Sequence, residues 1–326
     1  MYVGLLCTPA DAFKTRDASL DPHGSEQMDL TMKAIEKALL NIGHKVVRIP
    51  ATTNLLEDIK AIEGIEIIFN TCTGITSKMQ QANVVAMLEL MDLPFVGSGL
   101  SAHIFGLHKQ ISKYLFRSVG VPTANFQIFY SGEEAVDLSL NYPLIIKPEH
   151  EGSSLGITED SVVHDEEQLR AGVRRIFKLF RQPALAEEFI TGREFTIGVL
   201  GNDNLEVLPI QEIIYDTADG KGFMTVDIKA RDAIGTVCPA NLDNATVVKI
   251  KDYATKAFKV INCKEYARID VRLDAEEIPY FLEINTLPGM QPAYSDFPRV
   301  AYAAGYTYDS LIQKMLALSM DRNEKR

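Results

Sequence analysis

Polar and apolar residues alternate within residues 268–289, RIDVRLDAEEIPYFLEINTLPG, which is the most informative stretch of the chain. Two alternating runs are separated by a polar turn at 274–279, so the pattern predicts a β-hairpin. Pairing Leu273 with Tyr280 across the turn fixes the expected register of the remaining pairs.

This register places two carboxylates on one face of the hairpin. Asp270 falls opposite Glu283, and Arg268 falls opposite Asn285. Like charges roughly 5 Å apart destabilise a sheet unless something neutralises them. Carboxylate and amide oxygens without a nearby His or Cys are typical Mg²⁺ ligands, so the hairpin predicts a magnesium site. The alternative is a solvated surface hairpin whose register is slipped by a residue or two.

The first hundred residues alternate strand and helix patterns, which favours an open parallel sheet in an α/β layer. We predict strands at 2–6, 45–49 and 65–70 and helices at 26–42 and 79–91.

Beyond residue 100, residues 101–119 have the pattern of one continuous helix with Lys109 well inside it. We predict a second helix at 244–261 and strands near 125–129, 144–147, 195–200, 205–213, 267–273 and 279–285. The charged end, DRNEKR, is expected to fray.

The length of 326 residues exceeds one ordinary hydrophobic core. We predict an N-terminal α/β domain at 1–100, a central subdomain at 101–184, and a C-terminal subdomain at 185–326 that carries the hairpin. The mix of Gly, Asp and Lys at 214–236 predicts a mobile, polar lid loop in this last subdomain.

Composition limits the class of partner. A net charge of −11 argues against nucleic acid or an anionic membrane as the main partner and favours small molecules. The four cysteines lie far apart without a CxxC pair, which favours reduced thiols over disulfides or a zinc site. We find no secretory leader and no run of 18 apolar residues, and therefore predict a cytoplasmic protein.

A lysine and a Gly/Ser-rich loop follow a buried strand at residues 144–156, LIIKPEHEGSSLG. Such a loop can bind phosphate through backbone N–H groups and hydroxyls, and Lys147 supplies a fixed positive charge. It is not a Walker loop, since GxxxxGK[ST] is absent. The alternative for residues 152–156 alone is a simple Ser/Gly turn.

Residues 185–194, LAEEFITGRE, form a short apolar strand pattern with acidic residues. Backbone groups at 188–190 could bind an adenine edge, and Glu194 could accept hydrogen bonds from a ribose. Taken alone, acidic residues at a strand end are usually just solvated.

Together these segments resemble the ATP-grasp ligases, and most of all the D-alanine–D-alanine ligase branch. The resemblance covers about residues 84 to 320. It rests on MLELMDLPFVGSGLSAHIFGLHKQISKYLFRSVGVPT, LIIKPEHEGSSLGIT, AEEFITGREFTIGVL, VDIKARDAIGTVCPA, ARIDVRLD and FLEINTLPGM, in that order. It implies an α/β ATP-grasp fold, in which an N-terminal open parallel α/β domain precedes two α+β subdomains that grip ATP.

The resemblance implies that the chain uses ATP and Mg²⁺, with Mn²⁺ able to substitute. Two lysines would bind the nucleotide, a lid loop would close on its phosphates, and a strand would hold adenine and ribose. These roles fall respectively on Lys109 and Lys147, on Ser153 and Ser154, and on Glu187, Glu188, Phe189, Ile190 and Glu194. Lys229 resembles the lysine that reaches the γ-phosphate.

The metal and substrate residues are carried over in the same way. The resemblance assigns Asp270, Glu283 and Asn285 to Mg²⁺, in agreement with the hairpin pattern. It implies catalytic roles for Arg268, Gly289, Lys229, Ser153 and Glu26: Arg268 and the Gly289 N–H would stabilise the oxyanion, and Glu26 would bind the first substrate's ammonium. The second substrate would meet either Tyr294 or Ser295.

The sequence departs from the family where the substrates bind. FNTCTGITSKMQQAN has neither the His nor the acid of the family's first-substrate signature, so Thr73 to Gln80 replace them. The loop before Glu26 is longer and more charged than expected, and Ala230 stands where the family has Tyr. We therefore expect intact ATP machinery and altered acceptor pockets.

The predicted activity is amide bond formation through an acyl phosphate, with amino-acid or short-peptide substrates that differ from D-alanine. Alternatives are an intramolecular cyclo-ligase, a hydroxy-acid ligase, a genuine D-alanine–D-alanine ligase, and a nucleotide-binding protein without ligase turnover. We also predict a homodimer.

Overall fold

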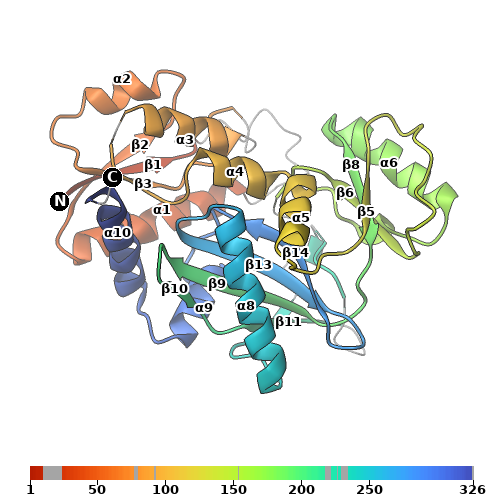
Figure 1. Ribbon diagram of the computed structural model, residues 1–326. Helices are drawn as coiled ribbons and strands as arrows, with labels where there is room; N and C mark the ends of the chain where they lie inside the picture. Colours follow the sequence, from red (N-terminus) through yellow and green to blue (C-terminus); the bar gives the residue numbers. More distant parts are fainter. Residues whose placement is uncertain are drawn as a thin grey trace.

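The computed structural model contains three β-sheets that follow one another along the chain (Figure 1). It describes residues 1–9, 24–76, 80–91, 93–152, 154–216, 222–225, 227–228 and 234–324.

The first sheet has the strand order β2-β1-β3-β4, and its strands are parallel, as predicted. The strands are β1 (Tyr2–Cys7), β2 (Lys45–Pro50), β3 (Ile67–Asn70) and β4 (Phe95–Val96). Its helices are α1 (Gly24–Asn41), α2 (Leu55–Lys60), which the pattern did not predict, and α3 (Gln81–Leu90). Val3 and Leu5 pack in one core with α1, whereas Leu6 packs in another with α2 and α3, because successive strand residues face opposite sides.

The predicted continuous helix at 101–119 is wrong. The segment forms α4 (Leu100–Leu107) and α5 (Lys109–Ser118), because His108 has an extended backbone at φ −82° and ψ 102°. The Lys109 N–H donates to the Glu149 carbonyl at 3.3 Å. Lys109 is therefore the first residue of a helix and not part of a helix interior.

The second sheet has the order β5-β8-β6-β7, with antiparallel neighbours. It comprises β5 (Phe126–Phe129), β6 (Leu144–Pro148), β7 (Val162–Val163) and β8 (Ala184–Glu188), with η4 (Glu159–Ser161) before β7. Helix α6 (Glu166–Phe180) covers one face, and its Leu169, Val173 and Ile176 share a core with β6 and β8.

The third sheet has the order β12-β11-β9-β13-β14, and β10 pairs with β9. Its strands are β9 (Glu194–Gly201), β10 (Leu205–Val207), β11 (Gln211–Tyr215), β12 (Ile234–Val237), β13 (Glu265–Leu273) and β14 (Pro279–Asn285). The predicted single strand at 205–213 is therefore two strands. Helix α8 (Asn244–Val260) begins at its N-cap Asp243 and packs on this sheet.

The hairpin of β13 and β14 keeps the predicted functional pairs. Arg268 lies opposite Asn285, and Asp270 lies opposite Glu283. The pairing of Leu273 with Tyr280 is wrong, because Leu273 pairs with Pro279. A bulge at Leu282, between the pairs Asp270–Glu283 and Val271–Phe281, adds one residue to β14 and restores the carboxylate pair.

The two C-terminal helices pack on the third and first sheets. Helix α9 (Asp296–Ala303) packs on β9, and α10 (Tyr308–Glu324) packs on α1 and β4. Arg322 donates to the carbonyls of Gly97 and Phe95 at 2.9 and 2.7 Å. The prediction that the charged end frays is therefore wrong for residues 321–324, which are helical. The last two residues lie outside the described chain, and the three domain boundaries stay a prediction.

In the part of the chain that the structure describes, no helix is long and apolar enough to span a bilayer.

Candidate active site

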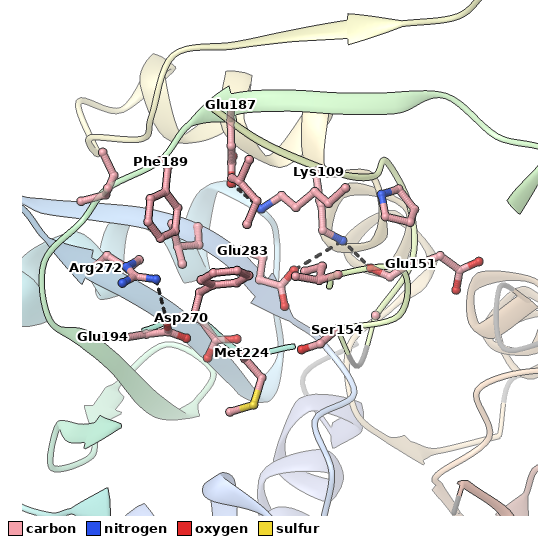
Figure 2. Close-up of a pocket in the computed structure, with 18 of the residues that line it drawn as sticks. Lys109, Glu151, Ser154, Glu187, Phe189, Glu194, Met224, Asp270, Arg272 and Glu283 are labelled. Carbon is pink, nitrogen blue, oxygen red and sulfur yellow. Dashed lines mark hydrogen bonds and ion pairs between the residues drawn. The ribbon is translucent and has the colours of Figure 1, made fainter. Parts of the chain in front are cut away.

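A pocket of about 1050 Å³, partly open to solvent, lies between the second and third sheets (Figure 2). One wall comes from β6, β8 and the loop after β6, and the other from β9, β13 and β14. Its apolar side chains include Ile145, Leu155, Phe189, Ile213 and Leu282, and its polar ones include Lys109, Lys147, Glu194, Arg268, Asp270, Arg272, Glu283 and Asp296.

The hairpin supplies an oxygen-rich cluster at this pocket. Asp270 accepts hydrogen bonds from Arg268 at 3.0 and 2.8 Å and from the Thr196 hydroxyl at 2.7 Å. The Asn285 amide lies 3.2 Å from Asp270 and 3.4 Å from Glu283, so it reaches both carboxylates. The oxygen atoms of these three residues suit Mg²⁺ as ligands. For Asn285 this requires the side-chain amide to be flipped, so that its oxygen and not its nitrogen faces the carboxylates.

Positive charges keep the cluster ionised. The Lys109 Nζ lies 3.4 Å from Glu283 and also donates to the Glu151 carbonyl. Burial opposes ionisation of Glu283, but Lys109, Lys147 and Arg268 outweigh it and hold its pKa at about 2. Arg268 stays a cation, because Asp270 and Asp296 raise its pKa against the opposing effect of burial.

A second charged cluster lies on the β6 and β8 side of the pocket. Glu187 is buried between Lys147 and Lys113, with Lys113 at 2.6 Å. Burial raises the pKa of Glu187, but the two lysines outweigh it and set the value at about 2. Burial lowers the pKa of Lys113 to about 8, although Glu187 opposes this shift. Lys113 was missed in the sequence, where its position one helical turn after Lys109 was the available signal.

Glu188 and Phe189, the two residues after Glu187, make different kinds of contact. The Glu188 carboxylate accepts hydrogen bonds from Asn141 at 3.0 and 2.9 Å and from Asn125 at 3.0 Å. The Phe189 ring lies in the pocket, 5.5 Å from the Phe223 ring centre. Both residues and Ile190 line the pocket, and the Glu188 carboxylate already accepts these three hydrogen bonds.

Glu194 lies beside an arginine that sequence reasoning missed. Arg272 contacts its carboxylate at 3.1 Å, and the Tyr215 hydroxyl donates to it at 2.8 Å. Burial raises the pKa of Glu194, and Arg272 opposes that shift. Arg272 also donates to the carbonyls of Gly192 and Gly222 at 2.9 and 2.6 Å, and its guanidinium lies 4.9 Å from the Phe189 ring centre. In the sequence, Arg272 could have been found from the alternation that places it on the same strand face as Arg268 and Asp270.

The loop after β6 is only partly described. Ser154 lines the pocket and has a left-handed backbone at φ 58°. Ser153 and Lys229 lie outside the described residues, so their predicted roles stay predictions.

The predicted substrate residues are more dispersed. Glu26 is exposed in the first turn of α1, and it is absent from the lining of the pocket described above. Gly289 is exposed, and a side chain there would meet the Ser295 hydroxyl at 2.7 Å. Ser295 and Tyr294 are both half-buried, and the Ser295 hydroxyl accepts the Gln291 N–H at 3.1 Å. Asp296 lines the pocket, accepts from Gln211 at 2.8 Å, and was missed.

A threonine pair lies at the start of the segment 73–80, which lacks the His and the acid of the expected first-substrate signature. Thr8 follows β1, and Thr73 lies three residues beyond β3. Their hydroxyl oxygens are 3.1 Å apart, and the Thr73 N–H donates to Thr8 at 2.9 Å. Both lie at the carboxyl ends of adjacent parallel strands, where open α/β sheets bind ligands.

Comparison with known proteins places these features in a family. The family model described as D-ala D-ala ligase C-terminus matches residues 115–317. The chain belongs to the D-alanine–D-alanine ligase family. It is 33% identical over 305 residues to a D-alanine–D-alanine ligase from Carboxydothermus hydrogenoformans, covering 90% of this chain and 94% of that one.

Two solved structures share the ATP-grasp fold of this family. A D-alanine–D-alanine ligase from Bacillus anthracis, crystallised with ATP, is 22% identical with a TM-score of 0.77, covering 100% of this chain and 99% of that one. The VanG D-Ala:D-Ser ligase from Enterococcus faecalis is 19% identical with a TM-score of 0.77, covering 98% and 99%. The chain is accordingly an ATP-dependent ligase that forms C–N bonds.

Proposed function

We propose that the chain phosphorylates the carboxylate of an amino acid or short peptide and joins it to the amine of a second substrate. A carboxylate oxygen attacks the γ-phosphorus of ATP and releases ADP. The amine then attacks the acyl carbon, and phosphate leaves with one of the original carboxylate oxygens. The single observation that carries this proposal is the oxygen cluster of Asp270, Glu283 and Asn285, which lies beside the lysines of the same pocket.

ATP would occupy the pocket with its adenine on the apolar side. Ile145, Phe189 and Leu282 supply that surface. The Glu188 and Phe189 N–H groups already donate to the carbonyls of Asn125 and Pro143, at 2.9 Å each. We therefore assign the adenine contact to the next donor, the Ile190 N–H.

We assign the Glu194 oxygen Oε1 as the acceptor of hydrogen bonds from the ribose hydroxyls, because Oε2 already accepts hydrogen bonds from Tyr215 and Arg272. Lys109 and Lys147 would contact phosphate oxygens, together with Ser153, Ser154 and Lys229.

The phosphoryl group would transfer next to the hairpin. Asp270, Glu283 and Asn285 would hold Mg²⁺, which would screen the charge on the transferring phosphate. Arg268 is held by Asp270 and also lies 3.8 Å from Asp296, so its guanidinium keeps a fixed direction at the pocket. We propose that it stabilises the tetrahedral oxyanion with the Gly289 N–H.

The first substrate is proposed to be larger or more polar than D-alanine. An imidazole could provide a charged donor to a substrate carboxylate, whereas Thr73 and Thr8 provide two neutral hydroxyls. A buried polar group left unpaired costs about 1–3 kcal/mol, or roughly tenfold to a hundredfold in rate. D-Alanine should therefore be a poor first substrate.

A panel of D- and L-amino acids, tested singly and in pairs, checks this proposal by phosphate release and mass spectrometry of the products. We expect another first substrate to exceed D-alanine by tenfold or more. Synthesis of D-alanyl-D-alanine at about 10⁴ M⁻¹s⁻¹ or better would contradict the divergent substrate and leave the ligase chemistry standing.

The cyclising and hydroxy-acid alternatives rest on Ala230, which lies outside the described residues. A cytoplasmic location and a homodimer remain proposals from the sequence.

A further inference from the structure

A His-Glu-His cluster lies beside the pocket and is not used by the proposed chemistry. His108 is in the break between α4 and α5, and Glu149 and His150 follow β6 directly. The Nδ1 atoms of His108 and His150 lie 2.8 and 2.9 Å from the same Glu149 oxygen, Oε2. The three potential ligand atoms all lie within 4.8 Å of one another.

We propose that His108, Glu149 and His150 bind a divalent transition-metal ion of the Zn²⁺ class. Two imidazoles and a carboxylate form a donor set that proteins use for zinc, whereas Mg²⁺ prefers oxygen ligands alone. The site would thus differ in metal preference from the oxygen cluster of the hairpin. The ligation depends on no part of the proposed ligase reaction.

The spacing requires only a small adjustment. Ligand bonds of about 2.0–2.1 Å in a tetrahedral site separate neighbouring ligand atoms by about 3.3–3.4 Å. The present distances of 2.8 and 2.9 Å are those of hydrogen bonds, so each imidazole would move outwards by about 0.5 Å. The side chains of His108 and His150 are 39% and 24% exposed, which leaves room for this movement and a path for the ion.

The carboxylate is already oriented for such a role. Glu149 is buried, and its other oxygen, Oε1, accepts the Gln110 N–H at 3.1 Å. Hydrogen bonds that fix a ligand in this way are typical of metal sites.

The nearby positive charge is directed elsewhere. Lys109 follows His108, but its ammonium contacts the Glu151 carbonyl and Glu283. An ion bound by neutral imidazoles and one carboxylate would carry a net charge of about +1. It would connect the start of α5 to the loop after β6, because His150 is followed by Glu151 and Gly152, which line the pocket.

The test is a titration of the full-length protein with Co²⁺ and Zn²⁺, without nucleotide, followed by Co²⁺ absorption and calorimetry. We expect one site per chain that is retained in His164→Gln, a matched control at an exposed histidine of the same region. His150→Gln and His108→Asn should each weaken binding at least tenfold. Asp270→Asn should leave this site intact, because it alters only the hairpin.

Hydrogen exchange gives a second measurement. Zn²⁺ should slow exchange in peptides covering His150 to Gly156 in the wild-type protein, and not in His150→Gln. Circular dichroism establishes whether each variant is folded. If His108→Asn does not fold, the test rests on His150→Gln alone. Absence of binding, binding unchanged in folded His150→Gln, or binding lost only in Asp270→Asn would overturn the proposal.

Discussion

Glu187→Gln removes the negative charge that two buried lysines share, with little change in side-chain size. The pKa of Glu187 is held at about 2, against an ordinary 4.5. This lowering of the Glu187 pKa corresponds to about 3 kcal/mol of stability. Because the folded-state pKa is lowered, this contribution is present above pH 4.5 and is lost as the pH falls towards 2.

The substitution also leaves Lys113 without its partner at 2.6 Å. The pKa of Lys113, about 8 beside Glu187, should then fall further, so that the ammonium loses its proton near neutral pH. Deprotonation of Lys113 relieves part of the cost of this unpaired buried charge, because the neutral amine needs no anionic partner. We therefore expect Glu187→Gln to lose about 3 kcal/mol, at the lower end of the range for breaking a buried ion pair.

Urea unfolding followed by circular dichroism at pH 7 and pH 8 measures this loss. The deficit should be smaller at pH 8, because an uncharged Lys113 in the folded variant makes its stability rise with pH in that interval. The wild-type protein gains little there, because its Lys113 stays largely protonated up to about pH 8. Glu167→Gln on the exposed face of α6 is the control and should stay within about 1 kcal/mol. A loss below about 1 kcal/mol in Glu187→Gln would refute the reasoning.

Three further substitutions test the pocket. Glu283→Gln and Asn285→Ala should each abolish product formation in a phosphate-release assay. Their circular dichroism spectra should stay unchanged, since the substitutions remove oxygen ligands and not core packing. Normal turnover of either variant at low Mg²⁺ would exclude the assigned metal site. Arg272→Lys keeps the charge but cannot reproduce the contacts to Glu194, Gly192 and Gly222, so the KM for ATP should rise about tenfold or more, corresponding to about 1.5–3 kcal/mol. An unchanged KM in steady-state assays would show that Arg272 does not organise the nucleotide pocket.

The hairpin shows what alternation can predict. A period of two fixes which residues share a face, so Asp270 and Glu283 were predicted as opposite neighbours. The pattern could not locate the bulge, because Leu282 looks like an ordinary apolar strand residue in the sequence. The assumed pairing of Leu273 with Tyr280 was wrong, and the functional pairs are correct because the bulge shifts the register by one residue.

Contacts between distant segments account for the other differences. Helical periodicity continues through His108, and the chain breaks there in contact with Glu149, 41 positions away. Arg272 and Lys113 occupied visible positions on a strand face and a helix face. Their partners, Glu194 and Glu187, follow only from how β8, β9 and α5 pack together. The charged end similarly stays helical because Arg322 reaches the carbonyls beside β4.

The fate of the carboxylate oxygens tests the central claim most directly. The substrate pair with the highest activity in the amino-acid panel is supplied with ¹⁸O in the carboxylate of the first substrate, and the products are analysed by mass spectrometry. Transfer through an acyl phosphate predicts one ¹⁸O atom in the released inorganic phosphate for each amide formed, with ADP as the nucleotide product. Amide formation with unlabelled phosphate, or with the label in AMP, would contradict the account.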